Sequence, residues 1–543
     1  MIWHFADIFE NIAAMVPDRL ALIEGGKRRT WREYEDRAAR LAGALVAAGI
    51  APDAKVAIYG HNSVEYLEAQ FAVFKAHGVP INVNYRYVEE ELAYLFDNAD
   101  VEAVFFDARF APRLAAIRDR LPGLKTFIRI DDGSGEVLEG AQDYDALIAA
   151  HAPLPRLEYS EDDIYMLYTG GTTGMPKGVM YRHADLARAV AAWVLGPEVE
   201  PTPELLLALI EQTAAAGAAP VRLPACPLMH GTGMWLGAFG GHFWGGAIAL
   251  LRDEGFDAHR VWAFVAAERI NVVVIVGDAF AKPMLAALNE ARDRGEAYDL
   301  SSLMGIVSSG VMFSTEVKLG LLDHADIAIS DGMGSTEGSM GTSVVSRAAP
   351  PGETAHFMIN PKARVFDEDD DEVAPGSDRI GMIGSGGYIP VGYYKDPEKT
   401  AKTFRTIRGT RYSFPGDFAR VAADGTLILL GRGSVCINTG GEKVFPEEVE
   451  EALKAHPSVW DALVVGVPDE RFGERVVGVI SAGEGEVIDQ AALIDHARTR
   501  LAGYKMPRAL VVVERVQRAA NGKADYRWAR DTALAATALT ATA

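Results

Sequence analysis

Residues 168–178 read Tyr168-Thr169-Gly170-Gly171-Thr172-Thr173-Gly174-Met175-Pro176-Lys177-Gly178, a run of glycines and small hydroxyl residues that closes with one lysine. Glycines allow tight turns that bring backbone N–H groups close to phosphate oxygens, and the threonines and Lys177 add further donors and positive charge. The apolar residues 164–168 directly before this run predict a buried strand. We therefore expect an anion-binding loop at the end of a strand, where α/β proteins place their ligands.

Two other interpretations of this loop are less favoured. A Walker P-loop has Ser or Thr directly after its lysine, whereas Gly178 follows Lys177 here, and the Gly171 to Gly174 spacing is too short. A flexible surface loop is also rich in glycine and threonine. An apolar strand followed by turn-forming residues and a lysine is, however, a more constrained pattern than a surface loop requires.

The chain has 543 residues, which predicts three or more structural units. Hydrophobic residues make up 49% and charged residues 24% of the chain, a balance typical of soluble globular proteins. The formal net charge of −22 argues against non-specific binding to nucleic acid or to anionic membranes, because both require a basic face. Any bound polyanion must therefore meet a local positive site.

The two cysteines, Cys226 and Cys436, are too few for a disulfide framework and indicate a reducing compartment. The first residues lack the basic flank and the apolar segment of a signal peptide. The most apolar windows, 237–251 and 272–276, are too short or too interrupted to cross a membrane. We expect a cytoplasmic protein with no integral membrane segment.

Helix and strand patterns alternate along most of the chain and predict an α/β fold with at least two sheets. Residues 33–48 and 64–77 have helical patterns around a strand at 56–59, and the alternation resumes over 261–276 and 314–329. Short strands and turns from about 360 to 431 predict a β-rich subdomain. The acidic run 367–372 within it indicates a solvated turn, because it lacks the spacing of a calcium loop.

A domain boundary is expected at the two glycines that flank Arg432. Helical patterns at 446–455 and 490–502, with strands at 462–467, 476–480 and 510–513, predict a small α+β domain. We thus expect an N-terminal domain over 1–431, which includes the β-rich subdomain, and a C-terminal domain over 432–543. The tail 531–543, rich in alanine and threonine, predicts no definite element.

Further motifs follow the glycine–threonine loop in a fixed order. They are Pro227-Leu228-Met229-His230-Gly231-Thr232-Gly233, Ser308-Ser309-Gly310-Val311-Met312, Asp331-Gly332-Met333-Gly334-Ser335-Thr336-Glu337, Tyr393-Tyr394-Lys395-Asp396-Pro397-Glu398-Lys399-Thr400, Tyr412-Ser413-Phe414-Pro415-Gly416-Asp417, Gly431-Arg432-Gly433-Ser434-Val435-Cys436-Ile437-Asn438-Thr439-Gly440-Gly441-Glu442-Lys443 and Asn521-Gly522-Lys523-Ala524-Asp525. Each motif alone has an ordinary explanation, such as a strand-end turn, a glycine turn before a helix, or a solvated lysine. Their order is far more specific.

This series of motifs resembles the adenylate-forming superfamily of acyl-CoA synthetases, adenylation domains and luciferases, from about Thr30 to Arg527. The phrases that begin at Gly431 and Tyr393 are most similar to bacterial fatty-acyl and steroid side-chain acyl-CoA synthetases. The resemblance implies a large N-terminal AMP-binding α/β domain of several subdomains and a small mobile C-terminal domain. It also implies ATP, Mg²⁺ and CoA as ligands.

The resemblance assigns nucleotide-binding roles to individual residues. The loop residues Thr169, Gly170, Gly171, Thr172, Thr173, Gly174 and Lys177 would hold the β and γ phosphates of ATP. Ser309, Gly310, Asp331, Gly332, Met333 and Gly334 would line the adenine. Thr336 would meet the α phosphate, Glu337 would bind Mg²⁺, and Asp417 and Arg432 would contact the ribose side of the nucleotide.

Three positions depart from the pattern of the family. Met333 stands where an aromatic residue usually lies beside adenine, Pro415 replaces a threonine, and Ser434 replaces the usual Asp or Lys of the hinge. The nucleotide contacts and the hinge signature that depend on these positions are therefore altered.

The resemblance makes Lys523 the catalytic lysine, which would bridge the acid carboxylate and the α phosphate, and His230 a gate between the acyl and thiol routes. Met234 and Trp235 with Gly310 would line a hydrophobic acyl pocket. Further apolar residues and glycines offer area and room for it, although ordinary core packing has the same pattern: Phe239, Phe243, Gly237, Gly240, Gly241, Gly245 and Gly246. Gly440, Gly441 and Lys443, with Arg475 as a further candidate, would meet CoA.

The implied enzyme is an acid–thiol ligase that converts a hydrophobic carboxylic acid to an acyl-adenylate and then to a CoA thioester. Alternatives are a ligase that loads a carrier protein, a luciferase-like oxygenase, or a binding sensor that has lost catalysis. The sequence leaves open which acid is used, whether fatty, steroid or aryl. It also leaves open the pathway and the oligomeric state, with a homodimer as one option.

Overall fold

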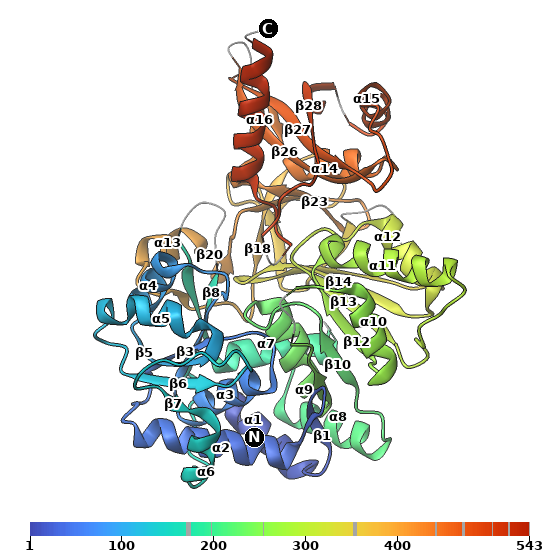
Figure 1. Cartoon of the computed structure of the whole chain (residues 1–543). Helices are drawn as coiled ribbons and strands as arrows, with labels where there is room; N and C mark the ends of the chain where they lie inside the picture. The colour runs from blue at the N-terminus through green and yellow to red at the C-terminus, as the bar shows by residue number, and fades with distance from the viewer. Residues whose placement is uncertain are drawn as a thin grey trace.

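The computed structural model describes residues 1–169, 175–196, 198–252, 255–350, 356–439, 442–469, 473–501, 503–519 and 522–541. The predictions for Gly170, Gly171, Thr172, Thr173, Gly174, Gly440 and Gly441 lie outside these residues, as do those for the side chains of Arg432 and Lys443. Strands of the described residues form four sheets, with helices packed against them (Figure 1). The predicted α/β class is confirmed.

The first sheet is parallel and is covered by helices on both faces. Its strands, in order, are β4 (Val79–Asn82), β3 (Lys55–Tyr59), β5 (Val101–Asp107), β6 (Thr126–Ile130) and β7 (Gln142–Asp143). Alternate residues of β3 enter different cores: Val56 and Ile58 join α2 (Trp31–Ala47) and α3 (Val64–Lys75), whereas Ala57 and Tyr59 join α4 (Glu89–Asn98) and α5 (Ala111–Ile117). This alternation explains why both faces need cover.

The second sheet has a parallel half and an antiparallel half. The parallel half contains β1 (Leu20–Glu24), β11 (Ala247–Ala249), β10 (Val221–Pro224), β12 (Val272–Ile275), β13 (Gly305–Ser309) and β14 (Ala328–Ser335). Helices α10 (Ala258–Ala267), α11 (Gly277–Asp293) and α12 (Thr315–His324) pack on one of its faces.

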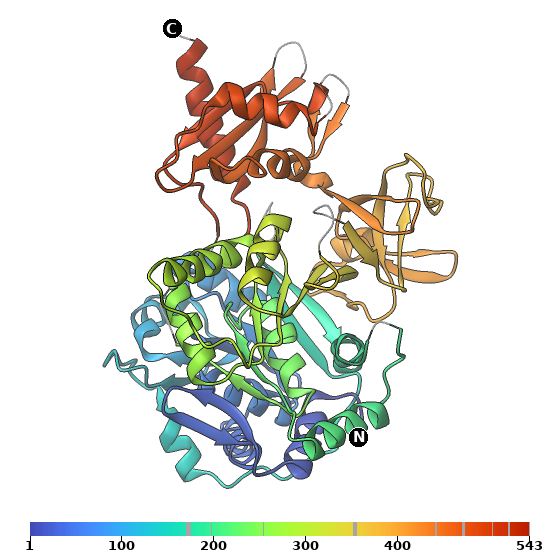
Figure 2. The ribbon, with the colours of Figure 1, turned by 90° about the vertical axis from the view of Figure 1, so that its right-hand side faces the viewer.

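Beyond β14 the strands are antiparallel and lead into the β-rich region. They are β15 (Gly338–Val345), β16 (His356–Ile359), β17 (Ala363–Phe366), β18 (Gly381–Ser385), β20 (Phe404–Ile407), β21 (Thr410–Ser413), β22 (Asp417–Val421) and β23 (Leu427–Arg432). In Figure 2 this region lies between the main body and the C-terminal unit.

A third, three-stranded antiparallel sheet carries the glycine–threonine loop. Strand β8 (Ile164–Thr169) and β9 (Lys177–Arg182) form a hairpin, and β19 (Gly392–Tyr393) pairs with the other edge of β9. The predicted strand before the loop is confirmed. It belongs to a hairpin, however, and not to a parallel sheet, because β9 turns back directly after the loop.

The C-terminal unit has its own sheet, built from β24 (Ile437–Thr439), β25 (Glu442–Val444), β26 (Val459–Asp469), β27 (Gly473–Ala482) and β28 (Ala509–Val513). Helices α14 (Pro446–Lys454) and α15 (Gln490–Arg498) cover one face, and α16 (Tyr526–Ala541) covers the other. Figure 1 shows this unit above the rest of the chain.

Two local expectations differ from the structure. Residues Asp331–Ser335 lie within strand β14, and the turn at Thr336 and Glu337 leads into strand β15 and not into a helix. The tail from Asp531, which predicted no element, continues helix α16, because Ala529 and Ala533 are buried against β26 and β27. Among the described helices, none is long and apolar enough to cross a membrane.

Several glycines expected to leave room for a ligand instead allow close packing. A Cβ at Gly237 would lie 2.8 Å from Pro224 Cγ, and one at Gly241 would lie 2.4 Å from Ile248 Cδ1. The segment η3 (Thr232–Phe239), a π-helix, and α9 (Gly240–His242) therefore pack directly on β10 and β11. Phe239 and Phe243 lie in the core, as the alternative of ordinary core packing expects.

Replacing Gly246 tests this packing. A Cβ there would lie 2.2 Å from the carbonyl oxygen of Pro220, a backbone atom that cannot rotate away. We expect Gly246→Ala to destabilise the protein by about 1–3 kcal/mol and to lower its thermal unfolding midpoint. Gly26→Ala is the control, because a Cβ at Gly26 meets no atom within 4 Å. Equal midpoints for the two variants would contradict the packing argument.

Candidate functional site

The hairpin of β8 and β9 places both ends of the glycine–threonine loop side by side. Thr169 is opposite Lys177 in the register. The Lys177 ammonium lies 2.6 Å from Asp396 Oδ2 and 6.0 Å from the centroid of the Tyr393 ring. The cation is therefore fixed at the mouth of the loop by residues from a distant part of the sequence.

The acidic turn between β14 and β15 is attached to the same three-stranded sheet. The Tyr181 hydroxyl donates a hydrogen bond to the carbonyl oxygen of Thr336 at 2.9 Å. The Tyr393 hydroxyl donates to Glu337 Oε1 at 2.7 Å. Two tyrosines from adjacent strands thus join the phosphate-loop sheet to the predicted metal-binding carboxylate.

Asn82, at the end of β4, links the loop strand to the segment that carries His230. Its side-chain amide donates to the carbonyl oxygens of Tyr168 at 2.9 Å and Met229 at 2.7 Å, and its Oδ1 accepts from the Tyr168 N–H at 2.7 Å. Asn62 similarly contacts Cys226 O and the Leu228 N–H. The carboxyl edge of the first sheet therefore fixes residues 226–230.

His230 is neutral at physiological pH. Burial, together with the nearby charges of Lys523 and Arg86, lowers the pKa of its imidazole to about 3. Within the described part of the chain, its buried Nε2 has no hydrogen-bond partner. A neutral ring with an unused nitrogen is suited to a polar ligand group that lies in the site.

The packing of Gly522 places the C-terminal loop against helix α11, and the charge of the neighbouring Lys523 acts on His230. Gly522 is buried, with φ of +76°, and a Cβ there would lie 2.6 Å from Ala279 Cβ on α11. Arg518 donates to the Gly522 carbonyl at 3.2 Å and forms an ion pair with Asp461. The loop is therefore shaped within its own domain and inserted against the other.

A second contact joins the two domains beside this loop. Lys282 on α11 donates to the carbonyl oxygen of Trp460 at 2.5 Å, and its ammonium lies 5.4 Å from the centroid of the Trp460 ring. Burial lowers the pKa of Lys282. The carbonyl acceptor and the ring help to offset this loss of water, together with Asp278, whose Oδ2 lies 3.8 Å from the same ammonium.

The predicted adenine segments lie on neighbouring parallel strands. Ser309 is opposite Gly332, and its hydroxyl donates to the Gly332 carbonyl at 2.7 Å. The Asp331 side chain faces inward, 3.0 Å from the buried Lys318 ammonium, and burial raises its pKa to about 6. The Met333 side chain is also buried, in the core with Met340 and Phe357. Both side chains thus serve packing, while their backbones stay at the site.

The remaining predicted residues occupy positions around this centre. Asp417 begins β22, half-buried, and is opposite Arg432 in the register. A Cβ at Gly310 would lie 3.8 Å from Thr232 Oγ1. Trp235 is half-buried and its indole N–H donates to the Tyr165 hydroxyl at 3.2 Å, whereas Met234 lies in the core. Trp235 is therefore the more accessible of the two acyl-pocket candidates.

Glu337 is chemically suited to Mg²⁺. Nucleotide-bound Mg²⁺ needs only one or two protein carboxylates, because phosphates and water complete its shell. Oε1 of Glu337 is held by Tyr393, and among the described residues no protein donor contacts Oε2. The structure thus presents one oriented carboxylate oxygen, on a side chain held by the same tyrosine whose ring centroid lies 6.0 Å from the Lys177 ammonium.

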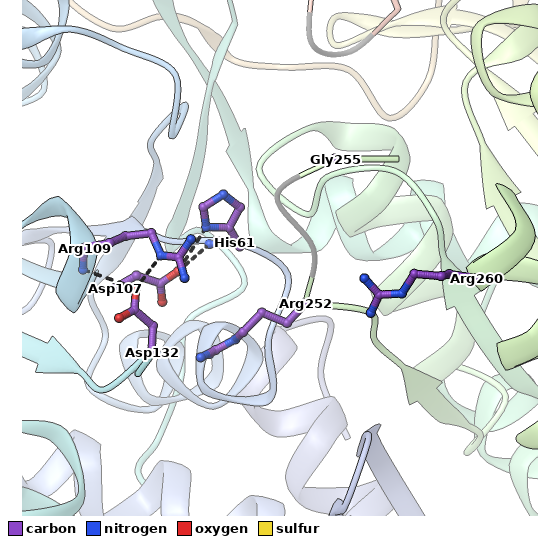
Figure 3. Close-up of a pocket in the computed structure, with 7 residues that line it drawn as sticks. All are labelled: His61, Asp107, Arg109, Asp132, Arg252, Gly255 and Arg260. Carbon is purple, nitrogen blue, oxygen red and sulfur yellow. Dashed lines mark hydrogen bonds and ion pairs between the residues drawn. The ribbon is translucent and has the colours of Figure 1, made fainter. Parts of the chain in front are cut away.

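A separate cavity of about 490 Å³ lies at the carboxyl edge of the first sheet (Figure 3). It is lined by His61, Asp107, Arg109, Asp132, Arg252, Gly255 and Arg260, none of which was predicted as a site residue. Arg109 pairs with Asp132 and Arg252 with Glu65, while His61 contacts Asp107. These contacts offset charge within the cavity, so the arginines alone do not make it an anion site.

The sequence motifs do not reveal several residues of the site. They contain Tyr393 and Asp396 without indicating a role for either, and they include neither Asn82 nor Tyr181. An asparagine at the end of a strand is the one available signal, because such a side chain meets loops at the sheet edge. The contacts of both tyrosines depend on strand pairing that the sequence does not reveal.

Two family models of known enzymes match the chain. A family model described as AMP-binding enzyme matches residues 9–393, and one described as AMP-binding enzyme C-terminal domain matches residues 448–523. The chain therefore belongs to the AMP-binding enzymes of the adenylate-forming superfamily, and the resemblance found in its motifs is confirmed.

Among the AMP-binding enzymes, the chain is similar to particular CoA ligases over nearly its whole length. The chain is 44% identical over 540 residues to a 3-oxocholest-4-en-26-oate–CoA ligase of Rhodococcus rhodochrous, covering 98% of this chain and 96% of that protein. It is 44% identical over 539 residues to a medium/long-chain-fatty-acid–CoA/3-oxocholest-4-en-26-oate–CoA ligase of Mycolicibacterium smegmatis, with the same coverage. The similarity thus spans nearly the whole length of all three proteins.

Solved structures show the same fold. The anthranilate–CoA ligase AuaEII in complex with anthranoyl-AMP matches with a TM-score of 0.84 and 22% identity, over 98% of both chains. ATP-bound MatB from Rhodopseudomonas palustris matches with a TM-score of 0.80 and 25% identity, over 97% of this chain and 98% of that one.

The lowered pKa of His230 predicts an acid-sensitive stability. The unfolded state takes up a proton near pH 6.5 and the folded state only near pH 3, so stability is fully present above pH 6.5 and decreases as pH falls toward 3. We expect His230→Gln to reduce this loss by up to about 1.4 kcal/mol per pH unit, measured by urea unfolding from pH 7.5 to 4.5.

The control for this experiment is His259→Gln. The His259 side chain is 43% exposed and is bonded to Tyr298 and Glu290 at the surface. Its variant should keep the pH dependence of the wild-type protein. If His230→Gln also kept it, the neutral state of His230 would be refuted.

Proposed function

We propose that this protein is an AMP-forming acyl-CoA synthetase. A carboxylate oxygen attacks the α phosphorus of ATP, pyrophosphate leaves, and an acyl-adenylate forms. The CoA thiol then attacks the acyl carbon, and AMP leaves with its bonding pair. One observation supports the proposal above all: the loop that carries Lys523 packs against α11 through Gly522, which is what a cation supplied by the C-terminal domain to the N-terminal site requires.

The first step depends on offsetting negative charge. Thr169, Lys177 and the loop between them are proposed to hold the pyrophosphate side of ATP. Thr336 contacts the α phosphate, and Glu337 holds Mg²⁺, which supplies further positive charge when bound. Lys523 bridges the attacking carboxylate and the α phosphate, and the neutral His230 lets an anionic acid approach without forming a competing ion pair.

We propose that the protein contacts the adenine and the ribose mainly through backbone atoms and short side chains. Ser309, Gly310 and the backbone from Gly332 to Gly334 line the adenine, and Asp417 accepts hydrogen bonds from the ribose hydroxyls. Arg432 contacts the nucleotide at the start of the connection between domains. The inward side chains of Asp331 and Met333 support this surface from behind and do not contact adenine.

The acid is proposed to be a medium- or long-chain fatty acid or a steroid side-chain acid. Relatives at 44% identity carry those substrates in their names. Gly310 opens the entrance, and Trp235, anchored on Tyr165, forms an apolar wall. Met234 shapes this wall from the core.

The second step is proposed to need a rotation of residues 432–543 against 1–431. Lys523 leaves the site, and Gly440, Gly441 and Lys443 approach with CoA. Arg475 is a further candidate for the CoA phosphates. The contact between Lys282 and Trp460 must break in this rotation. A carrier-protein thiol as acceptor is the alternative, and thioester assays that compare CoA with a carrier protein decide between them.

Replacement of Lys523 tests the adenylation site. We expect Lys523→Ala to reduce carboxylate-dependent ATP–pyrophosphate exchange by about 10²–10³-fold, because it removes a donor aimed at developing charge. Conversion of a supplied acyl-adenylate with CoA should change less than threefold. Lys125→Ala, at an exposed site, is the control. Equal losses in both half-reactions would contradict the assigned role.

A panel of acids tests the substrate class. We expect CoA products from fatty acids of about 8–18 carbons or from 3-oxocholest-4-en-26-oate, detected by mass spectrometry, and little product from benzoate or acetate. Strong activity with an aryl acid would refute the proposed pocket. If no acid supported exchange, the chain would be a binding sensor.

A further inference from the structure

We propose that Tyr393 is a positioning residue for the metal-binding carboxylate, and that Tyr393 and Asp396 together keep Glu337 and Lys177 at fixed positions that suit a metal–triphosphate. This inference rests on the proposed function, because it concerns the same nucleotide site. It adds a role for a segment that contacts neither the acid nor the reacting atoms.

Tyr393 is itself firmly fixed. The residue is 5% exposed, and its ring lies 5.6 Å from that of Phe404, centroid to centroid. Its N–H donates to Thr400 Oγ1 at 2.9 Å, and its strand pairs with β9 at Val179. The backbone of Tyr393 and its ring are both held, so the position of its hydroxyl is fixed as well. That hydroxyl lies 2.7 Å from Glu337 Oε1.

The same segment holds the cation of the phosphate loop. Asp396 accepts from Lys177 Nζ at 2.6 Å through Oδ2, and its Oδ1 accepts from the Lys399 N–H at 3.0 Å, where it caps helix α13 (Pro397–Thr403). Lys177 and Lys399 also lie 6.0 and 5.9 Å from the centroid of the Tyr393 ring. One short segment thus contacts both charged groups assigned to the triphosphate.

These contacts keep two opposite charges apart. A lysine and a carboxylate that face one triphosphate attract each other, and a direct pair would occupy the groups that the ligand needs. Asp396 gives Lys177 a different partner, and the Tyr393 hydroxyl satisfies one oxygen of Glu337 without adding charge. Oε2 of Glu337 is left for a hard cation, and the donor on Oε1 fixes the plane of the carboxylate.

The test compares Tyr393→Phe with Tyr394→Phe. Both variants remove one hydroxyl from adjacent residues, but that of Tyr394 donates to Asp100 at 2.7 Å, away from Glu337. Mn²⁺ binding is measured by electron paramagnetic resonance in the presence of α,β-methylene-ATP. The Mg²⁺ concentration for half-maximal acid-dependent pyrophosphate exchange is measured in parallel.

We expect Tyr393→Phe to weaken Mn²⁺ binding and to raise the half-maximal Mg²⁺ concentration by roughly 10-fold, the effect typical of a lost partner of a metal ligand. Saturating Mg²⁺ should restore most of the rate. Tyr394→Phe should match the wild-type protein in both measurements. Phenylalanine keeps the ring packing, and circular dichroism at the assay temperature confirms that each variant is folded.

Three results would overturn the inference. Wild-type metal dependence in Tyr393→Phe would show that the hydroxyl does not position Glu337. An equal shift in Tyr394→Phe would show a general effect of the segment. A rate loss that saturating Mg²⁺ does not restore, with unchanged Mn²⁺ binding, would place Tyr393 outside metal positioning. If the wild-type protein lacked exchange activity, the proposed function would fail, while Mn²⁺ binding would still test the role of Tyr393.

Discussion

The pairing of strand β9 on both of its edges is the constraint on which the site depends. On one edge β8 closes the glycine–threonine loop, and on the other β19 brings in the segment that begins at Tyr393. Tyr181, from β9 itself, reaches the turn that carries Glu337. Backbone pairing therefore fixes Lys177 and the two tyrosines relative to one another, and the tyrosine hydroxyls hold the turn that carries Glu337.

Burial decides the charge of several side chains around this sheet. His230 is neutral because it is removed from water. The carboxyl of Asp331, with a pKa raised to about 6, depends on Lys318 to offset the cost of burial. Such an inward pair makes the floor of the nucleotide segment rigid while leaving its backbone exposed. Within one motif, the buried side chain of Asp331 therefore supports the fold, whereas the backbone of the same segment serves the nucleotide site.

The sequence predicts the fold class and most elements well, because helix and strand periods repeat along each domain. The strand before the phosphate loop and the helix that begins at Val64 are examples. The motifs also indicate Lys177, Glu337 and Lys523. The sequence does not reveal that Asp396 binds Lys177 or that Gly241 is filled by Ile248, because both depend on pairing between distant segments. The sequence also does not show that strand β14 continues to Ser335, because the glycines at 332 and 334 resemble those of a turn.

The loop that carries Lys523 has a well-defined shape, but the contact from Lys282 to Trp460 holds the two domains together only weakly. The Lys523 loop is shaped by Arg518 and Asp461 inside the C-terminal unit, so it keeps its form when that unit moves. The contact from Lys282 to Trp460 is a hydrogen bond to a neutral carbonyl together with a cation–π contact, each worth about 0.5–2 kcal/mol. Interactions of this size are small beside the energy of binding a triphosphate. In the proposed reaction, loss of pyrophosphate would therefore be able to shift the balance toward release of the loop, without any change inside either domain.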